Sequence, residues 1–412
     1  MSTARSIPRA GSLASALLLI AICSAILPPG YGAYIGAYLA LVASIVALAI
    51  YGWSERTVVR HPTSLAILVA IALVAVTLPF VYRGSQDLLA PVLVLPMLAT
   101  IAMGLLVRPA RWVPGVPTFA LVCCTASAIA LIGGAYQHFG LGIYRPGLGN
   151  NPIHYGSLAV MAGGLALVGV ATGTSSWRYL FLLGPVFGLA AAVISDSRGP
   201  MLGALAMGGV GIVTLFVWLR HDRWFQVAAA AGVVLAVTIV IYLVGSGNAR
   251  IAGILHSGLD IFRFSGGTDD IRAALYASAV EMLRTSPVVG VGLGQIMVTA
   301  ETLFPQQVAG TGLENLHADW ANFGAMAGGL GLLAWLLLLA APLLLLLDAR
   351  IRSDRPTLLG AILLTTGQFT LGISNATFGI LPQTTIYAVG LGYFLARARR
   401  IALEATETSP LS

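Results

Sequence analysis

The chain has 412 residues, of which 58% are hydrophobic and only 9% are charged. So few charged side chains cannot cover the surface of a soluble globule of this length, which excludes the soluble classes and predicts a polytopic membrane protein. The formal net charge is +7, and every basic residue apart from the histidines is an arginine.

Apolar runs of about 17 to 25 residues follow one another along most of the chain, each long enough for a helix to cross a ~30 Å hydrocarbon core. The runs lack the alternating ~10-residue pattern that is typical of an outer-membrane barrel. The sequence therefore predicts an all-α fold with about twelve transmembrane helices, at residues 12–29, 33–52, 64–82, 89–107, 116–136, 154–174, 179–196, 200–219, 226–245, 322–347, 357–374 and 378–396.

This division places nine spans in residues 1–245, a large polar loop in 246–321, three spans in 322–400 and a tail in 401–412. With a cytoplasmic N-terminus, 15 of the 22 arginines fall in inner segments, as the positive-inside bias requires. We therefore expect both termini in the cytoplasm and the large loop in the periplasm. The net positive charge therefore reflects membrane topology rather than an anionic partner such as nucleic acid. We expect membrane lipids as partners and no nucleic acid.

The first polar cluster on the predicted outer side lies in residues 144–156, where Gly and Pro residues form a tight loop. Arg145 and His154 are its polar tips. The cluster could bind an anion, or Arg145 could simply reach lipid headgroups from an ordinary hairpin.

The second cluster, residues 195–200, is a hinge of a few residues between two apolar runs and places Arg198 at the outer membrane surface. An ionisable group at this depth is a functional hypothesis by default. Arg198 could bind phosphate, or it could form a structural pair with Asp196.

The large loop is predicted to contain helices at residues 251–264, 269–285 and 295–304. In the middle helix, Arg272 and Tyr276 share a face because they are four residues apart. The glycine-rich segment 290–294 that follows has no lysine of the phosphate-loop type, so we interpret it as a tight turn between two helices.

His317 is predicted to open a long, uninterrupted helix that continues to about Leu347. The helix dipole would disfavour the imidazolium form there and keep the ring neutral, as a general base requires. The alternative is an ordinary surface histidine. The outer segments suggest no metal site, and the three cysteines all fall in predicted spans, which suggests small packing residues rather than a disulfide.

In their order, spacing and common outward placement, these motifs resemble the O-antigen ligase family, which includes O-antigen polymerases. The resemblance covers the chain from about Tyr144 to Leu347. It is carried by Gly149–Asn–Asn–Pro–Ile–His154, Ser197–Arg198–Gly199, the run from Arg272 to Tyr276 with Pro287–Val–Val–Gly–Val–Gly292, and Asn315–Leu–His317.

The resemblance implies an O-antigen ligase of lipopolysaccharide biosynthesis in a bacterial inner membrane. Such an enzyme transfers a glycan from undecaprenyl pyrophosphate to the lipid A core on the periplasmic face, with inversion and without a metal or other cofactor. It implies that Arg198 and Arg272 hold the pyrophosphate and that His317 is the catalytic base. Arg145, His154 and Tyr276 are further candidates for the donor cleft.

Two alternatives to the ligase remain open. An O-antigen polymerase uses the same donor, and the spacing of Arg145 and Gly156 fits an Arg-x10-Gly pattern attributed to polymerases. A transporter or flippase would move the lipid-linked glycan without cutting it, although we find no repeated halves of the kind common in transporters. In the family, an Asn or Ser commonly follows the histidine, whereas Ala318 follows His317, so its orienting partner could be Asn315 or Asp319.

Overall fold

The computed structural model describes residues 7–52, 55–110, 112–173, 175–245 and 268–408. Within these ranges the chain is helical, without a β-strand. The predicted helix at 251–264 lies outside the described residues. The principal helices are α1 Ile7–Ile26, α2 Gly32–Tyr51, α4 Pro62–Val81, α6 Leu98–Ala110, α7 Val116–Ala135, α8 Pro152–Ala166, α9 Leu183–Ile194, α10 Arg198–Leu219, α11 Arg223–Gly245, α13 Thr268–Thr285, α14 Ile296–Leu303, α16 Asp319–Leu344, α18 Arg355–Gly372 and α19 Leu381–Thr408.

Each of the twelve predicted spans overlaps one or more helical segments. Shorter helical pieces connect or extend them: α3 Arg56–Val59, η1 Ser85–Leu88, α5 Leu89–Val92, η2 Leu95–Met97, the π-helical η3 Tyr136–Gly140, η4 Leu167–Gly169, η5 Ser176–Leu182, η7 Leu293–Gln295, α15 Pro305–Val308, η8 Leu345–Leu347 and α17 Ala349–Arg352. Eight helical segments of the described chain are long and apolar enough to cross a membrane. The total of twelve stays a prediction.

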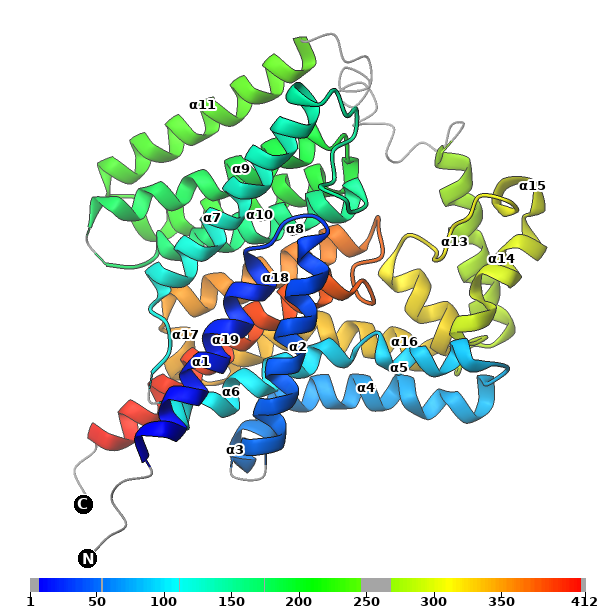
Figure 1. The fold of residues 1–412 in the computed structure, drawn as a ribbon, viewed down its shortest axis with the longest axis horizontal. Helices are drawn as coiled ribbons and strands as arrows, with labels where there is room; N and C mark the ends of the chain where they lie inside the picture. Colours follow the sequence, from blue (N-terminus) through cyan, green and yellow to red (C-terminus); the bar gives the residue numbers. More distant parts are fainter. Residues whose placement is uncertain (1–6, 53–54, 111, 174, 246–267, 409–412) are drawn as a thin grey trace, which may run out of the picture.

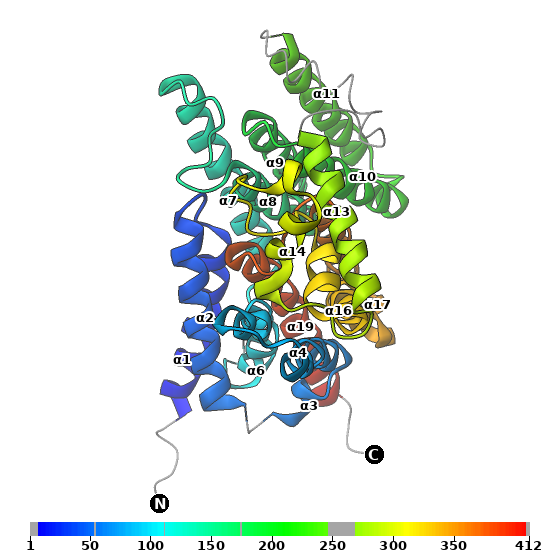
Figure 2. The ribbon, with the colours of Figure 1, turned by 90° about the vertical axis from the view of Figure 1, so that its right-hand side faces the viewer.

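The helices form a bundle with both termini at one end and α13, α14 and α15 on the opposite side (Figure 1). Helix α16 packs along α4, α8 along α9, and α19 along α6. In the turned view, α13 and α14 stand in front of the bundle, and α13 packs on α16 (Figure 2). The polar loop of the sequence thus contains an ordered helical group docked on the bundle.

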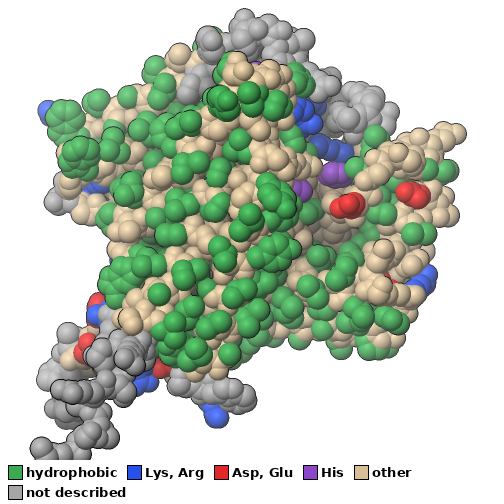
Figure 3. Space-filling view, viewed as in Figure 1, with side chains coloured by type: hydrophobic (Ala, Val, Ile, Leu, Met, Phe, Trp, Pro, Cys, Tyr) green, Lys and Arg blue, Asp and Glu red, His purple; other side chains and the backbone are tan. Residues whose placement is uncertain are grey.

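The bundle interior combines close backbone contacts with large aromatic side chains. A Cβ added to Gly163 of α8 would lie 2.3 Å from the carbonyl oxygen of Gly184 at the start of α9, so only small residues allow this approach. Tyr393 of α19 stacks on Phe119 of α7 with ring centroids 4.0 Å apart. The outer surface is also largely apolar: hydrophobic side chains cover much of the face in Figure 3, as expected of a lipid-facing surface.

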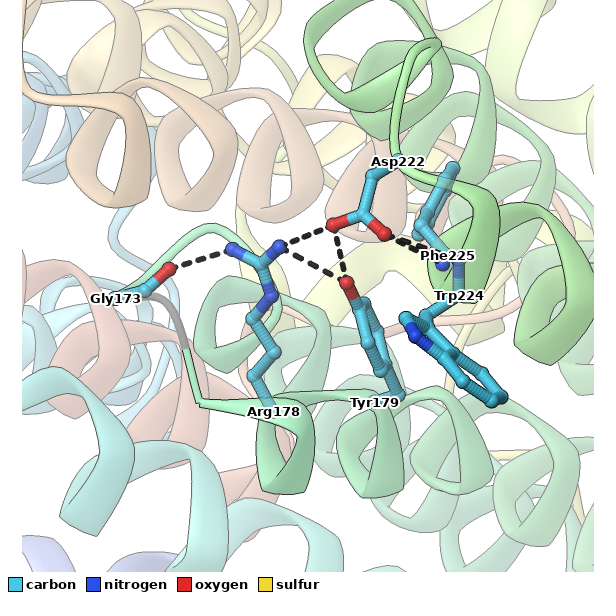
Figure 4. Close-up of polar contacts among 6 residues, drawn as sticks. All are labelled: Gly173, Arg178, Tyr179, Asp222, Trp224 and Phe225. Atoms are coloured by element: carbon cyan, nitrogen blue, oxygen red, sulfur yellow. Dashed lines mark hydrogen bonds and ion pairs between the residues drawn. The ribbon is translucent and has the colours of Figure 1, made fainter.

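A polar cluster fixes the start of α11 at the end of the bundle that is predicted to face the cytoplasm (Figure 4). One oxygen of Asp222 accepts hydrogen bonds from the backbone N–H groups of Trp224 and Phe225, both at 3.1 Å, and so caps the helix. Its other oxygen pairs with Arg178 at 2.5 Å and accepts the hydroxyl of Tyr179. The cluster joins η5 to α11 and gives Arg178 a structural role.

The prediction of an uninterrupted helix from His317 to Leu347 is wrong, because α16 begins at Asp319 and is kinked at Gly328 (φ 62°, ψ −145°). At the kink, the segment that follows α13 forms backbone hydrogen bonds with α16. Val291 donates to the carbonyl of Ala325 at 2.8 Å, and Gly329 donates to that of Pro287 at 2.8 Å. A glycine pair, Gly328–Gly329, is a known cause of such kinks.

The interpretation of 290–294 as a tight turn is confirmed. The backbone N–H groups of Val291 and Gly292 donate to α16, and that of Gly294 donates to the buried carboxylate of Asp87 at 2.8 Å. These amides are already occupied by protein acceptors, so they do not form a phosphate-binding loop.

We predict that Gly328→Ala destabilises the protein. The backbone conformation at this position is one that only glycine adopts readily, and a new Cβ would lie 2.5 Å from the carbonyl carbon of Val288. Strain of this kind costs about 1–3 kcal/mol. The midpoint of thermal unfolding, measured by tryptophan fluorescence in detergent, should fall.

The matched control is Gly209→Ala in α10, where an added Cβ meets nothing within 4 Å and the helix favours alanine. Its unfolding midpoint should not fall. Equal midpoints for the two variants would contradict the assigned role of the kink.

Candidate functional site

A cavity of about 510 Å³ opens where α8, α9, α10, α13 and the entry to α16 meet. Histidine and arginine side chains gather in the hollow between the bundle and the α13–α15 group (Figure 3). The cavity is lined by Arg145, Ile153, Asp196, Ser197, Arg198, Gly199, Ile271, Arg272, Thr311, Leu313, His317 and Ser374. Four of the six candidate site residues from the sequence, Arg145, Arg198, Arg272 and His317, therefore come together.

Arg198 is the first residue of α10 and follows a sharp turn in which Asp196 has a left-handed backbone conformation, with φ 51°. This turn directs α10 away from α9 and leaves the Arg198 side chain exposed at the cavity. Arg198 forms no hydrogen bond or ion pair with another residue that the structure describes. Asp196 instead accepts the hydroxyl of Tyr144 at 3.3 Å.

Arg272 reaches the cavity from α13, whose position is fixed by its packing. Leu275, Ala279 and Met282 of α13 are buried, and the Tyr276 ring packs on Trp320 of α16 with centroids 5.6 Å apart. Within the described ranges Arg272 also has no hydrogen bond or ion pair. Two guanidinium groups without an ion-pair partner among the described residues thus face one cavity, which Asp196 also lines.

Arg145 occupies the same cavity but is tethered. Its Nε and Nη2 donate to the backbone carbonyls of Ser195 and Asp196, both at 3.4 Å. A cation at this place compensates the negative end of helix α9. The geometry makes Arg145 a support for the turn before Arg198 as well as a lining residue.

His317 lies before α16, rather than on its first turn as predicted, and has a left-handed backbone with φ 54°. Two side chains stabilise this turn. Asn315 accepts the backbone N–H of His317 at 2.9 Å, and Asn322 accepts that of Leu316 at 2.9 Å. Tyr276 does not line the cavity; its hydroxyl donates to the His317 carbonyl at 3.4 Å and so supports the same turn.

Burial lowers the pKa of His317 below its usual value of 6.5, and the positive charge of Arg272 lowers the pKa further. The polar side chain of Asn375 beside the imidazole favours the protonated form and so raises the pKa, which opposes these effects. His317 is therefore neutral at neutral pH. The cause is burial and a neighbouring arginine, not a position inside the helix dipole.

Asp319, proposed from the sequence as a possible partner of the imidazole, has another role. It is fully buried, and its carboxylate accepts the backbone N–H groups of Thr377 at 2.7 Å and Phe378 at 3.0 Å as well as the Thr377 hydroxyl. These bonds tie the start of α16 to the loop between α18 and α19. That loop carries Ser374 and Asn375, which sequence reasoning missed.

No local pattern in this loop signals a site, because it has no charged residue. The only available signal was a pair of polar residues between Gly372 and Gly379, on the predicted outer side.

His154 lies on α8 and does not line the cavity, although it is close enough to His317 to interact with it electrostatically. In the described ranges, no group of three or more His, Cys, Asp or Glu side chains could hold a metal ion.

The fold and the cavity define a multi-pass helical membrane protein with a cationic site at the end of its bundle opposite the termini. Residues 183–336 match the family model described as O-antigen ligase, so this part of the chain is similar to the O-antigen ligase family. No curated protein matches the chain. The family indicates a membrane glycosyltransferase of the ligase or polymerase type that acts in lipopolysaccharide biosynthesis in the inner membrane.

The matched region includes Arg198, Arg272 and His317. It begins after Arg145 and His154 and ends before Ser374 and Asn375. Arg145 and Ser374 therefore reach the cavity, and His154 and Asn375 come close to His317, through the fold alone.

We predict that the protonation midpoint of His317 lies below 6.5 and that two substitutions move it in opposite directions. Arg272→Gln should raise the midpoint because it removes a neighbouring positive charge. Asn375→Leu should lower it because it removes a contact that favours the imidazolium. The rate of His317 modification by diethyl pyrocarbonate, followed by peptide mass spectrometry from pH 4.5 to 8, reports the midpoint because only the neutral ring reacts.

Arg284→Gln is the control for the arginine substitution, because Arg284 is on the same helix with 74% of its side-chain surface exposed. It should leave the midpoint unchanged. A wild-type midpoint above 6.5, or a shift in the same direction for both site variants, would refute this account of the imidazole environment.

Proposed function

We propose that the protein is an O-antigen ligase that transfers a glycan from undecaprenyl pyrophosphate to the lipid A core on the periplasmic face. The observation that carries the proposal is the cavity in which Arg198, Arg272 and His317 meet, although they come from three separate segments of the chain. All three residues lie in the region that matches the O-antigen ligase family.

In this proposal, Arg198 and Arg272 bind the donor pyrophosphate. A guanidinium group binds phosphate oxygens through two parallel hydrogen bonds and stays charged at any working pH. The leaving pyrophosphate gains negative charge in the transition state, which the two arginines stabilise by preorganised charge. The lack of a hydrogen bond or ion pair to either arginine from another described residue supports this role, because within that part of the chain an incoming anion has no partner to displace.

His317 acts as the general base. It removes the proton from an acceptor sugar hydroxyl, and that oxygen attacks the anomeric carbon of the donor sugar from the side opposite the pyrophosphate. The new C–O bond forms while the bond to the pyrophosphate oxygen breaks, and the electron pair leaves with undecaprenyl pyrophosphate. A single displacement of this kind inverts the anomeric configuration.

The reaction as proposed uses no metal ion, because the arginines supply the positive charge. We further propose that both termini are cytoplasmic and that the cavity faces the periplasm. The arginine-rich inner segments and the common end of the two termini support this orientation.

We predict that His317→Ala lowers turnover by about 10²- to 10⁴-fold, the usual contribution of a general base, with little change in donor affinity. Arg198→Gln and Arg272→Gln should instead weaken binding of the lipid-linked donor and also reduce turnover. The measurement uses purified protein, a polyprenyl pyrophosphate glycan, lipid A core and a chelator. Products are separated on a gel, and donor affinity is measured separately.

Arg284→Gln, exposed on the same helix as Arg272, is the matched control and should retain full activity. Unchanged turnover in His317→Ala would remove His317 from the mechanism. Inhibition by the chelator that one divalent ion reverses would overturn the metal-free reaction.

The same assay separates the alternatives. Glycan on the lipid A core identifies a ligase, whereas a longer glycan that remains on the polyprenyl carrier identifies a polymerase. A transporter would give neither product, and would move a labelled lipid across vesicles in a manner that depends on Arg198 and Arg272 but not on His317.

A further inference from the structure

The loop between α18 and α19 contributes an uncharged part of the cavity wall, close to the arginines. It carries Ser374 and Asn375, and the Ser374 hydroxyl lies near Gly199, the residue that follows Arg198 in α10. Ser374 lines the cavity, and Asn375 is next to it in the chain and contacts the His317 imidazole. These two side chains are uncharged, so this wall suits a neutral polar ligand.

Two polar atoms of this wall are buried without a hydrogen-bond partner among the residues that the structure describes. They are the Ser374 hydroxyl oxygen and the Asn375 amide nitrogen, and Asn375 is only 4% exposed. A third such atom, Nδ1 of His154, lies on α8 close to His317. Buried polar groups are nearly always hydrogen-bonded, so unsatisfied groups that gather beside a cavity point to a ligand that completes them.

The loop holds these groups in fixed positions. Asp319 accepts three hydrogen bonds from Thr377 and Phe378, and the amide of Gln368 donates to the Thr377 hydroxyl at 2.7 Å. The same carboxylate belongs to the first residue of α16, two residues after His317. The fold thus fixes Ser374 and Asn375 relative to the imidazole, which a binding site for a small group requires.

We propose that Ser374 and Asn375 form, with His317, a subsite for a sugar hydroxyl of the acceptor. This rests on the proposed function and assigns the acceptor to the uncharged side chains and the donor pyrophosphate to the arginines. The Asn375 amide nitrogen and the Ser374 hydroxyl hydrogen-bond a hydroxyl of the acceptor sugar, while the oxygen of Asn375 orients His317. Asn375 is therefore both a specificity-determining residue for the acceptor and a positioning residue for the base.

A sugar hydroxyl suits these groups together with the imidazole. Hydroxyls both donate and accept hydrogen bonds, so they can satisfy an amide N–H, a serine hydroxyl and a neutral imidazole nitrogen together. A fully ionised phosphate only accepts, so it cannot donate to the neutral nitrogen of His317, whereas the guanidinium groups supply the positive charge that it requires.

Two variants test the subsite by steady-state transfer with lipid A core as the varied substrate. Ser374→Ala should raise the acceptor KM by about three- to tenfold, the contribution of one hydrogen bond, with donor affinity and the pH profile unchanged. Asn375→Asp keeps an oxygen against His317 but loses the amide donor. It should raise the acceptor KM by a similar factor and move the acid limb of the kcat profile to higher pH, because a carboxylate favours the imidazolium.

Ser353→Ala is the matched control, because Ser353 lies in the exposed turn before α18, at the opposite end of this helix from Ser374, and bonds only the carbonyl of Arg350. It should match the wild type. Thermal unfolding of each variant identifies loss of fold, and Ser374→Thr, which restores the hydroxyl, should recover the acceptor KM if the fold is intact.

The outcomes separate the two proposals. If wild-type protein transfers glycan but both site variants keep the wild-type acceptor KM, or weaken only donor binding, the subsite is wrong while the ligase function stands. If wild-type protein makes no product with lipid A core while a control ligase does, the proposed function is wrong. The proposed acceptor subsite is then wrong as well.

Discussion

The candidate site depends on one buried carboxylate, that of Asp319 at the start of α16. It accepts two backbone N–H groups and one hydroxyl from the loop between α18 and α19. Leaving a buried hydrogen-bond donor unsatisfied costs about 1–3 kcal/mol, so the loss of these bonds would be costly. This connection holds the His317 turn and the Ser374–Asn375 segment together, although they are far apart in the sequence.

The arginines depend on two other constraints. Arg198 follows the left-handed Asp196 turn, whose carbonyl Arg145 binds, so the first cluster of the sequence supports the second. Arg272 is placed by α13, and the segment after α13 is hydrogen-bonded into the Gly328 kink of α16. Helix α16 is therefore common to both sides of the site: its start holds the histidine turn, and its kink anchors the helix that carries Arg272.

The sequence predicted the helical segments because apolar runs of about 17 to 25 residues without a barrel pattern can span a bilayer only as helices. It also singled out Arg198, Arg272 and His317, mainly through the resemblance to the O-antigen ligase family, and the structure brings these residues to one cavity. It was insufficient for the start of α16, which depends on the side chains of Asn315 and Asn322 bonding the local backbone. It also missed Ser374 and Asn375, whose place beside His317 comes from contacts of Asp319 with residues 58 and 59 positions away.

The most direct test of the central claim is a structure of the full protein with a polyprenyl pyrophosphate glycan bound. Our account predicts that the pyrophosphate lies between Arg198 and Arg272, with the anomeric carbon of the first sugar directed toward His317. A pyrophosphate bound away from these arginines, or a sugar whose anomeric carbon points away from His317, would contradict it.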